Sequence, residues 1–161
     1  MKHKDFGGAL RAARIAKGLS MTAVSTLTGI SRATISFYEN RGTDPLFSYM
    51  VLICDLCDVD LNNIANTVRP ASHHRDGHSK SVSNRHIKSA TTLGAALKAG
   101  RESKRLSTRA VDALIGVGYV NISRYETDES RPSFTTTVRM CDLYGIYLDD
   151  LADILRNISV T

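Results

Sequence analysis

Hydrophobic residues recur every three or four positions along most of the chain and nowhere alternate cleanly with polar residues. Over residues 5–17, Phe6, Leu10 and Ala13 share one face of a predicted amphipathic helix. Four more helices are predicted after it: a short one that starts after Ser20, one over residues 31–40, one that begins at Pro45 and a short one from Leu61, with Asp60 as its cap. This pattern predicts an all-α fold.

The same pattern occurs twice, because the chain matches itself without a gap when it is shifted by 87 residues. About two dozen of the 63 positions in residues 5–67 are identical to their partners in residues 92–154. Two copies are too few for a solenoid, in which every repeat packs on its neighbours. The sequence therefore predicts two tandem five-helix domains, at residues 1–67 and 92–161, joined by a basic polar linker at residues 68–91.

The charge of the chain is concentrated in that linker. The 161 residues carry a net charge of +5, of which residues 68–91 contribute +4, from five Lys or Arg and one Asp. We expect this segment to be a flexible linker that is also able to lie along phosphates or in a minor groove. Its basic residues are Arg69, Arg75, Lys80, Arg85 and Lys88.

Composition excludes several classes of protein. Apolar residues make up 42% of the chain and charged residues 23%, which is typical of a globular protein. No apolar run approaches the ~20 residues that span a bilayer, and no signal-peptide core follows Met1. Three cysteines fit a reducing compartment. We expect a cytoplasmic protein that does not insert into a membrane.

Three clusters resemble reactive or metal sites, and each has a plainer interpretation. Cys54 and Cys57 are interpreted as buried apolar filler, because Cys141 repeats only the first of them. Asp149 and Asp150 are interpreted as a solvated face near the start of the fifth helix. A histidine-rich cluster is interpreted as solvated linker, and its members are His73, His74, Asp76 and His78. With no phosphate-binding loop and no nucleophile–base arrangement, we expect neither enzyme activity nor a cofactor.

Each copy contains two short helices separated by a glycine, Gly29 or Gly116, which is the pattern of a helix-turn-helix unit. In such a unit the second helix is held by inward side chains and projects an outer face that fits the DNA major groove. The predicted inward residues are Val24, Ile30, Ile35 and Tyr38, and in the second copy Val111, Val117, Ile122 and Tyr125.

The stretch from Leu19 to Asn40, followed by Pro45, resembles the lambda-repressor/Cro-like (XRE-type) helix-turn-helix family, and the resemblance extends over most of both copies. The resemblance implies a compact five-helix DNA-binding domain whose third helix reads bases. Arg32 and Arg124 would pair with guanine, and Asn40 and Arg41 would hold phosphate. The DNA-binding residues implied in this way are Ser31, Arg32, Ala33, Thr34, Ser36, Phe37, Asn40 and Arg41, with Tyr119, Val120, Asn121, Ser123 and Arg124.

The resemblance also implies an ion pair between the first and third helices, formed by Arg14 with Glu39 and by Arg101 with Glu126. The second copy departs from the family pattern. Asp112 stands where a small residue is expected, at the position of Ser25, and a carboxylate there should be costly whether it faces the third helix or DNA. Gly118 replaces the cap Ser31. The second copy is therefore expected to bind DNA more weakly or to serve as a pairing surface.

These features predict a sequence-specific transcriptional regulator that binds a double-stranded DNA operator. The two outward sets share only Ser36 and Ser123, so the predicted operator has two unlike half-sites. By analogy, we expect a nucleoid-associated repressor of a phage, plasmid or other mobile element. The alternative is an antitoxin or protein-interaction module whose second domain mediates pairing. The sequence is compatible with a single chain or a homo-oligomer, and leaves Phe37 as either a base contact or a dimer contact.

Overall fold

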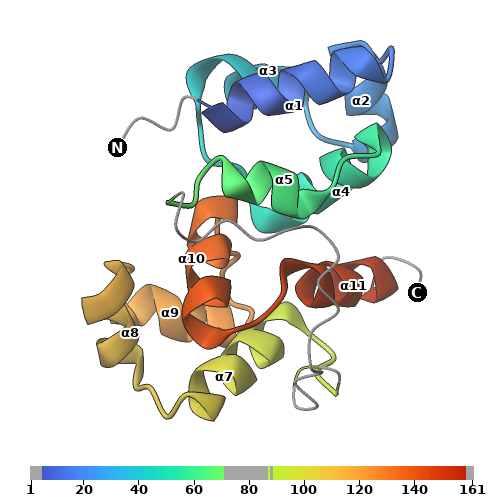
Figure 1. The fold of residues 1–161 in the computed structure, drawn as a ribbon. Coiled ribbons are helices and arrows are strands. Elements are labelled where there is room, and N and C mark those ends of the chain that lie inside the picture. The colour runs from blue at the N-terminus through green and yellow to red at the C-terminus, as the bar shows by residue number, and fades with distance from the viewer. Residues whose placement is uncertain (1–4, 71–86, 88, 159–161) are drawn as a thin grey trace. The chain divides into compact units, whose positions relative to one another are not determined.

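The computed structural model describes residues 5–70, 87 and 89–158. These residues form ten helices and no β-strand, so the all-α prediction is confirmed (Figure 1). The chain divides into two compact units, Met1–Ser79 and Lys80–Thr161, which are called the first and second unit below and are described separately. The predicted linker limits at residues 68 and 91 stay a prediction.

Over residues 5–70, the first unit contains five helices around one core. They are α1 (Asp5–Ala16), α2 (Met21–Thr28), α3 (Arg32–Arg41), α4 (Phe47–Cys57) and α5 (Leu61–Asn66). The first helix, α1, packs most extensively against α3 and also contacts α4 and α5 (Figure 1). Phe6, Leu10, Ile35, Phe47 and Met50 are each at most 2% exposed. Burial of this apolar face, more than the helix propensity of such short segments, stabilises the helices.

The second unit repeats the arrangement with α7 (Leu93–Ser103), α8 (Thr108–Ile115), α9 (Tyr119–Glu126), α10 (Phe134–Tyr144) and α11 (Leu148–Ile158). The prediction of a short fifth helix is wrong for this copy, because α11 has 11 residues where α5 has six. Asp149 and Asp150 lie in the first turn of α11 and Arg156 in the last, which complements the helix dipole. Arg156 also pairs with Asp153 at 2.8 Å. These charges support the longer helix.

Capping side chains define the start of the second helix in both units. The Ser20 hydroxyl accepts a hydrogen bond from the Ala23 N–H at 3.0 Å, and the Ser107 hydroxyl accepts one from the Ala110 N–H at 3.1 Å. Both caps were predicted. Each helix ends at a glycine with φ of +72° (Gly29) or +64° (Gly116), a left-handed conformation that favours glycine. The sharp turn that follows sets the direction of the third helix.

A second glycine allows the first and third helices to cross closely. A Cβ atom built on Gly7 in α1 would lie 2.6 Å from the Tyr38 carbonyl oxygen and 2.9 Å from the Glu39 carbonyl oxygen. At Gly94 in α7 the corresponding distances are 2.5 Å to Tyr125 and 2.8 Å to Glu126. Only a residue without a side chain permits these approaches. The third helix of each unit is therefore placed by backbone-to-backbone contact.

Several predictions need correction or completion. Arg69, assigned to the flexible linker, is only 6% exposed, and its Nη1 donates to the Asn66 Oδ1 at 3.2 Å, so this side chain is held in place rather than solvated. Of the residues predicted to be inward in the second copy, Val111 and Ile122 are buried, and Val117 and Tyr125 are half-buried. Asp149 and Asp150 are half-buried rather than fully solvated.

The cysteines and the histidine-rich cluster were the other candidates for reactive or metal sites. Cys54, Cys57 and Cys141 are buried thiols, as predicted, and burial raises the pKa of Cys57. His73, His74, Asp76 and His78 lie outside the described residues, as do Arg75, Lys80, Arg85 and Lys88. In the parts of the chain that the structure describes, no group of three or more His, Cys, Asp or Glu side chains is arranged to hold a metal ion.

Candidate nucleic-acid interface

The outer face of α3 forms a continuous stripe along the helix. Positions i, i+1, i+4, i+5, i+8 and i+9 lie on one face of an α-helix, and on α3 this face is opposite the buried Ile35, Tyr38 and Glu39. The six residues on the stripe are exposed except for the half-buried Ser36, and they are Arg32, Ala33, Ser36, Phe37, Asn40 and Arg41. The structure therefore brings these predicted residues together on one surface.

Three contacts order the side chains of this stripe and its start. The Ser31 hydroxyl accepts a hydrogen bond from the Thr34 N–H at 3.1 Å, so both predicted site residues take part in capping α3. Asn40 Nδ2 donates to the Ser36 carbonyl at 3.1 Å. The Arg41 guanidinium lies 4.8 Å from the centre of the Phe37 ring, which is a cation–π distance. Phe37 is 42% exposed, so the stripe includes an exposed apolar side chain among its polar ones.

The corresponding stripe on α9 has different chemistry. Tyr119, Val120, Ser123 and Arg124 are exposed on it, and Asn121 is exposed beside it. Arg109, at the start of α8, places its guanidinium 5.4 Å from the centre of the Tyr119 ring. Arg41 and Asn40 have no counterpart on α9, because Asp128 and Thr127 stand at those positions. The two stripes therefore share a geometry but few functional groups.

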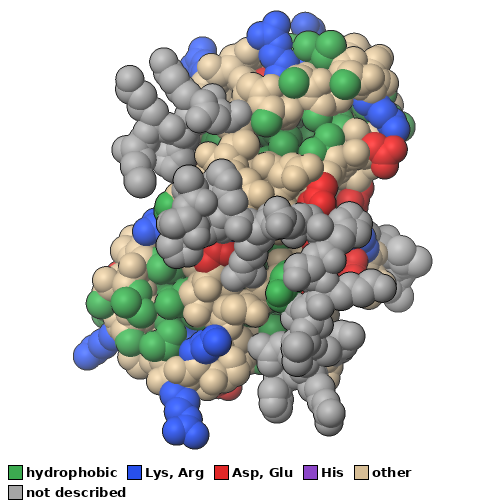
Figure 2. All heavy atoms as spheres, in the orientation of Figure 1, with side chains coloured by type: hydrophobic (Ala, Val, Ile, Leu, Met, Phe, Trp, Pro, Cys, Tyr) green, Lys and Arg blue, Asp and Glu red, His purple; other side chains and the backbone are tan. Residues whose placement is uncertain are grey.

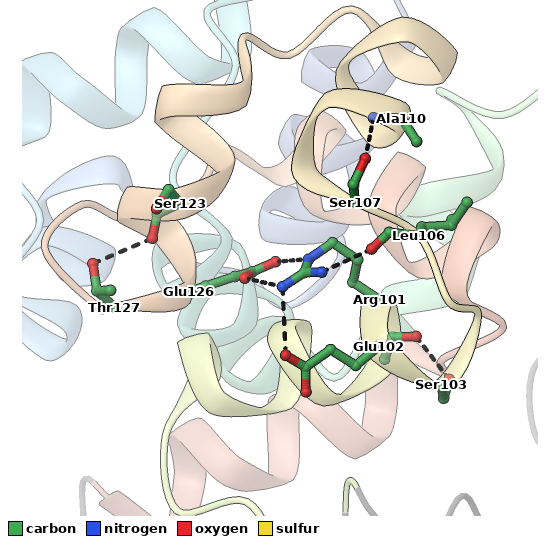
Figure 3. Close-up of polar contacts among 10 residues, drawn as sticks. Arg101, Glu102, Ser103, Leu106, Ser107, Ala110, Ser123, Glu126 and Thr127 are labelled. Carbon is green, nitrogen blue, oxygen red and sulfur yellow. Dashed lines mark hydrogen bonds and ion pairs between the residues drawn. The ribbon is translucent and has the colours of Figure 1, made fainter.

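An ion pair joins the first and third helices in each unit, as the resemblance implies, and it is buried in the first unit and partly buried in the second. Arg14 donates from Nε and Nη2 to the two Glu39 carboxylate oxygens at 2.6 and 2.7 Å, and from Nη1 to the Leu19 carbonyl at 2.7 Å. Arg101 repeats all three contacts with Glu126 and Leu106, at 2.6, 2.8 and 2.7 Å (Figure 3). The hydrogen bonds to Glu39 and Glu126 raise the pKa of the two arginines. The bidentate geometry orients the third helix.

Asp112 faces the third helix of its unit, which is one of the two positions expected for it. Its Oδ2 accepts a hydrogen bond from the Tyr119 backbone N–H at 3.1 Å, and this bond offsets the cost expected for a carboxylate at that place. Gly118 gives no side-chain cap, and the acceptor at the start of α9 comes from α8 instead. Asp112 accepts from the first residue of α9, whereas Ser31 accepts from the third residue of α3. A carboxylate at a helix N-terminus is stabilised by the helix dipole. The signal that sequence reasoning missed is that Ser25 and Ser31 are replaced together, by Asp112 and Gly118.

Exposed hydrophobic side chains gather near the turn of the second unit. Figure 2 shows them over α8 and α9, and the exposed fractions are 60% for Leu114, 45% for Tyr119 and 49% for Val120. The equivalent of Leu114 in the first unit, Leu27, is 63% exposed. Neither leucine was singled out in the sequence, although both align at the shift of 87 residues.

Comparison with known families agrees with this geometry. One family model, described as helix-turn-helix, matches residues 10–64, and another, described as a helix-turn-helix domain, matches residues 92–154. The chain belongs to the XRE-type helix-turn-helix family, in two copies. These helix-turn-helix units support a DNA-binding regulator. No curated protein and no solved structure matches the chain significantly.

Among the residues that the structure describes, no helix is both long enough and apolar enough to cross a bilayer.

Proposed function

We propose that the chain is a sequence-specific double-stranded DNA-binding transcriptional regulator, and that it represses by occupying its operator. The observation that carries the proposal is the solvent-facing stripe of α3, which is held on the core by Ile35 and Tyr38 and by the Arg14–Glu39 pair. An α-helix presented in this way fits the width of the B-DNA major groove.

The side chains on the stripes suit distinct contacts. Arg32 and Arg124 have the fork geometry for bidentate hydrogen bonds to guanine, and Ala33, Phe37 and Val120 are apolar partners for thymine methyl groups. We assign Asn40 and Arg41 to phosphate, and place Ser31 and Thr34 at the start of the reader helix. In the second unit, Tyr119, Asn121 and Ser123 complete the proposed contact set.

The unlike stripes favour an operator with two different half-sites. Adjacent half-sites on one face of DNA lie about one helical turn, ~34 Å, apart. The 16 residues at positions 71–86, between Pro70 and Ile87, span at most about 58 Å when fully extended. One chain is thus long enough for both units to reach adjacent half-sites. Binding of the first unit would raise the effective concentration of the second near DNA.

The remaining parts of the proposal are a repressor of a phage, plasmid or other mobile element, acting at the nucleoid in the cytoplasm. These rest on analogy with small helix-turn-helix regulators.

The test is selection of bound duplexes from a random pool with the full chain, followed by affinity measurement on the selected sequence. Arg32→Ala and Arg124→Ala should each weaken binding by about 5- to 150-fold and relax the preference at one base pair. Arg11 and Lys98 are matched controls, because they occupy equivalent exposed positions on α1 and α7, and alanine there should change affinity little. Selection of no sequence at all would refute the proposal.

A second candidate is favoured by the exposed Leu114, Tyr119 and Val120. The second unit would then mediate pairing with another protein or with a second chain, as in an antitoxin, and only the first unit would read DNA. In that case Arg124→Ala leaves DNA binding unchanged, and Val120→Ser weakens the assembly measured by sedimentation. The two candidates therefore differ in the variant that affects DNA affinity.

A further inference from the structure

The carboxylate of Asp112 carries an unneutralised negative charge beside the start of the proposed reader helix. In the described residues it accepts a hydrogen bond from the Tyr119 N–H, and no Lys or Arg forms an ion pair with it. Asp112 is half-buried, so its charge is only partly screened by solvent. Tyr119 and Val120, the first two residues of α9, lie on the outer stripe and are exposed.

The first unit leaves the same place uncharged. Ser25 stands at the position of Asp112, and Ser31 caps α3 by accepting from the Thr34 N–H. Within residues 5–70, the backbone N–H groups of Arg32 and Ala33 have no hydrogen-bond acceptor. The partial positive charge at the start of α3 is therefore available to an approaching phosphate, whereas at α9 a carboxylate already faces it.

A second substitution also makes the second unit more negative than the first near the third helix. Arg41, exposed on α3, is replaced by Asp128, whose Oδ1 accepts a hydrogen bond from the Gly94 N–H at 2.9 Å. Tyr119 likewise replaces Arg32. Three substitutions act in the opposite direction, because the exposed Arg109, Arg124 and Arg131 replace Thr22, Phe37 and Asp44. Both units thus carry basic side chains, and the distinguishing feature of the second is a carboxylate at the start of its reader helix.

Resting on the proposed DNA-binding function, we infer that Asp112 is an affinity-setting residue: it caps α9 and at the same time repels phosphate, so that the second unit binds DNA more weakly than the first. The residue does two things at once. As an acceptor it binds the N–H of Tyr119, the first residue of α9, and so holds α8 to α9. As a charge it lowers the affinity of that face for any polyanion.

The two roles are separable by substitution. Asp112→Asn keeps an oxygen acceptor at the same place and removes the charge, whereas Asp112→Ala removes both. The reciprocal double variant, Ser25→Asp with Ser31→Gly, gives the first unit the residues of the second. Its uncharged control is the double variant Ser25→Asn with Ser31→Gly. Comparison of Asp with Asn in each unit isolates the charge, because the two side chains have the same shape.

Affinity of the full chain is measured on the duplex selected by the wild type, between 50 and 500 mM salt. At low salt we expect Asp112→Asn to bind about three- to ten-fold more tightly than the wild type. The Ser25→Asp, Ser31→Gly variant should bind about three- to ten-fold more weakly than its Asn control. Both ratios should shrink toward one as salt rises, because the repulsion is screened.

The outcomes separate this inference from the proposed function. A wild type that binds, together with an Asp112→Asn variant of unchanged affinity at low salt, overturns the role of Asp112 and leaves the DNA-binding proposal standing. Loss of thermal stability in Asp112→Asn without a gain in affinity reduces Asp112 to a structural cap and equally overturns the inference. Failure of every variant to bind any duplex overturns the proposed function, and the inference with it.

Discussion

Two adjacent glycines in α1 offer a matched test of how α3 is held in place. Gly7 is buried against α3, where an added Cβ would lie 2.6 Å from the Tyr38 carbonyl oxygen, 0.8 Å short of an ordinary contact at 3.4 Å. Gly8 is exposed, and a Cβ there would meet nothing within 4 Å. Both changes to alanine gain the same helix propensity, ~1 kcal/mol. The difference between the two variants therefore measures the steric cost alone.

We expect this cost to be about 1–3 kcal/mol, because the blocking atoms are backbone oxygens that move only if a helix moves. Gly8→Ala should stabilise the first unit by up to ~1 kcal/mol. The Gly7→Ala variant should be less stable than the Gly8→Ala variant by the steric cost. Each kcal/mol of that cost should lower the melting temperature by about 4–8 °C.

The assay is thermal and urea unfolding of the full chain, followed by circular dichroism at 222 nm. Gly94→Ala in α7 serves as the equivalent change in the second unit, so that the transition belonging to each unit is identified. Gly7→Ala should also weaken DNA binding, because α3 must shift to relieve the contact. Equal stability of the Gly7→Ala and Gly8→Ala variants would refute the close crossing of α1 and α3.

Two other predictions concern buried polar groups. Arg14→Met leaves the Glu39 carboxylate, whose side chain is 3% exposed, without its partner, so the free energy of unfolding should fall by about 3–5 kcal/mol. The double variant Arg14→Met with Glu39→Leu should largely recover this loss, because no charge is left buried. A loss below ~1 kcal/mol for Arg14→Met in a denaturant titration would contradict the prediction. Tyr144 has a buried hydroxyl without a hydrogen-bond partner in the described residues, and burial raises its pKa well above 10. The unfolded chain therefore releases this proton first, and stability should decline as pH rises past ~10. Tyr144→Phe should be at least as stable at pH 7 and decline less in alkaline melts, and a steeper decline than wild type would refute the assignment.

Local signals accounted for most of what was predicted correctly. Ser20, Ser107 and Asp60 were predicted as caps from residue type and position, and each accepts the expected backbone hydrogen bond. The Arg14–Glu39 pair came from the family resemblance and is formed as implied. Predictions failed where the outcome depended on neighbours distant in the chain. Arg69 was assigned to a linker because it lies between the two repeat copies, yet its side chain is buried.

The sequence by itself determined the repeat of 87 residues, the helices, their capping residues and the glycine turns, because helix periodicity and capping are decided within one or two turns of chain. Only the tertiary structure decided which groups meet across helices. It showed that Gly7 and Gly94 permit the first and third helices to cross at backbone contact, and that Asp112 reaches the Tyr119 N–H. Such contacts depend on the angle and distance at which two helices pack, and these are set by the whole core rather than by any one segment.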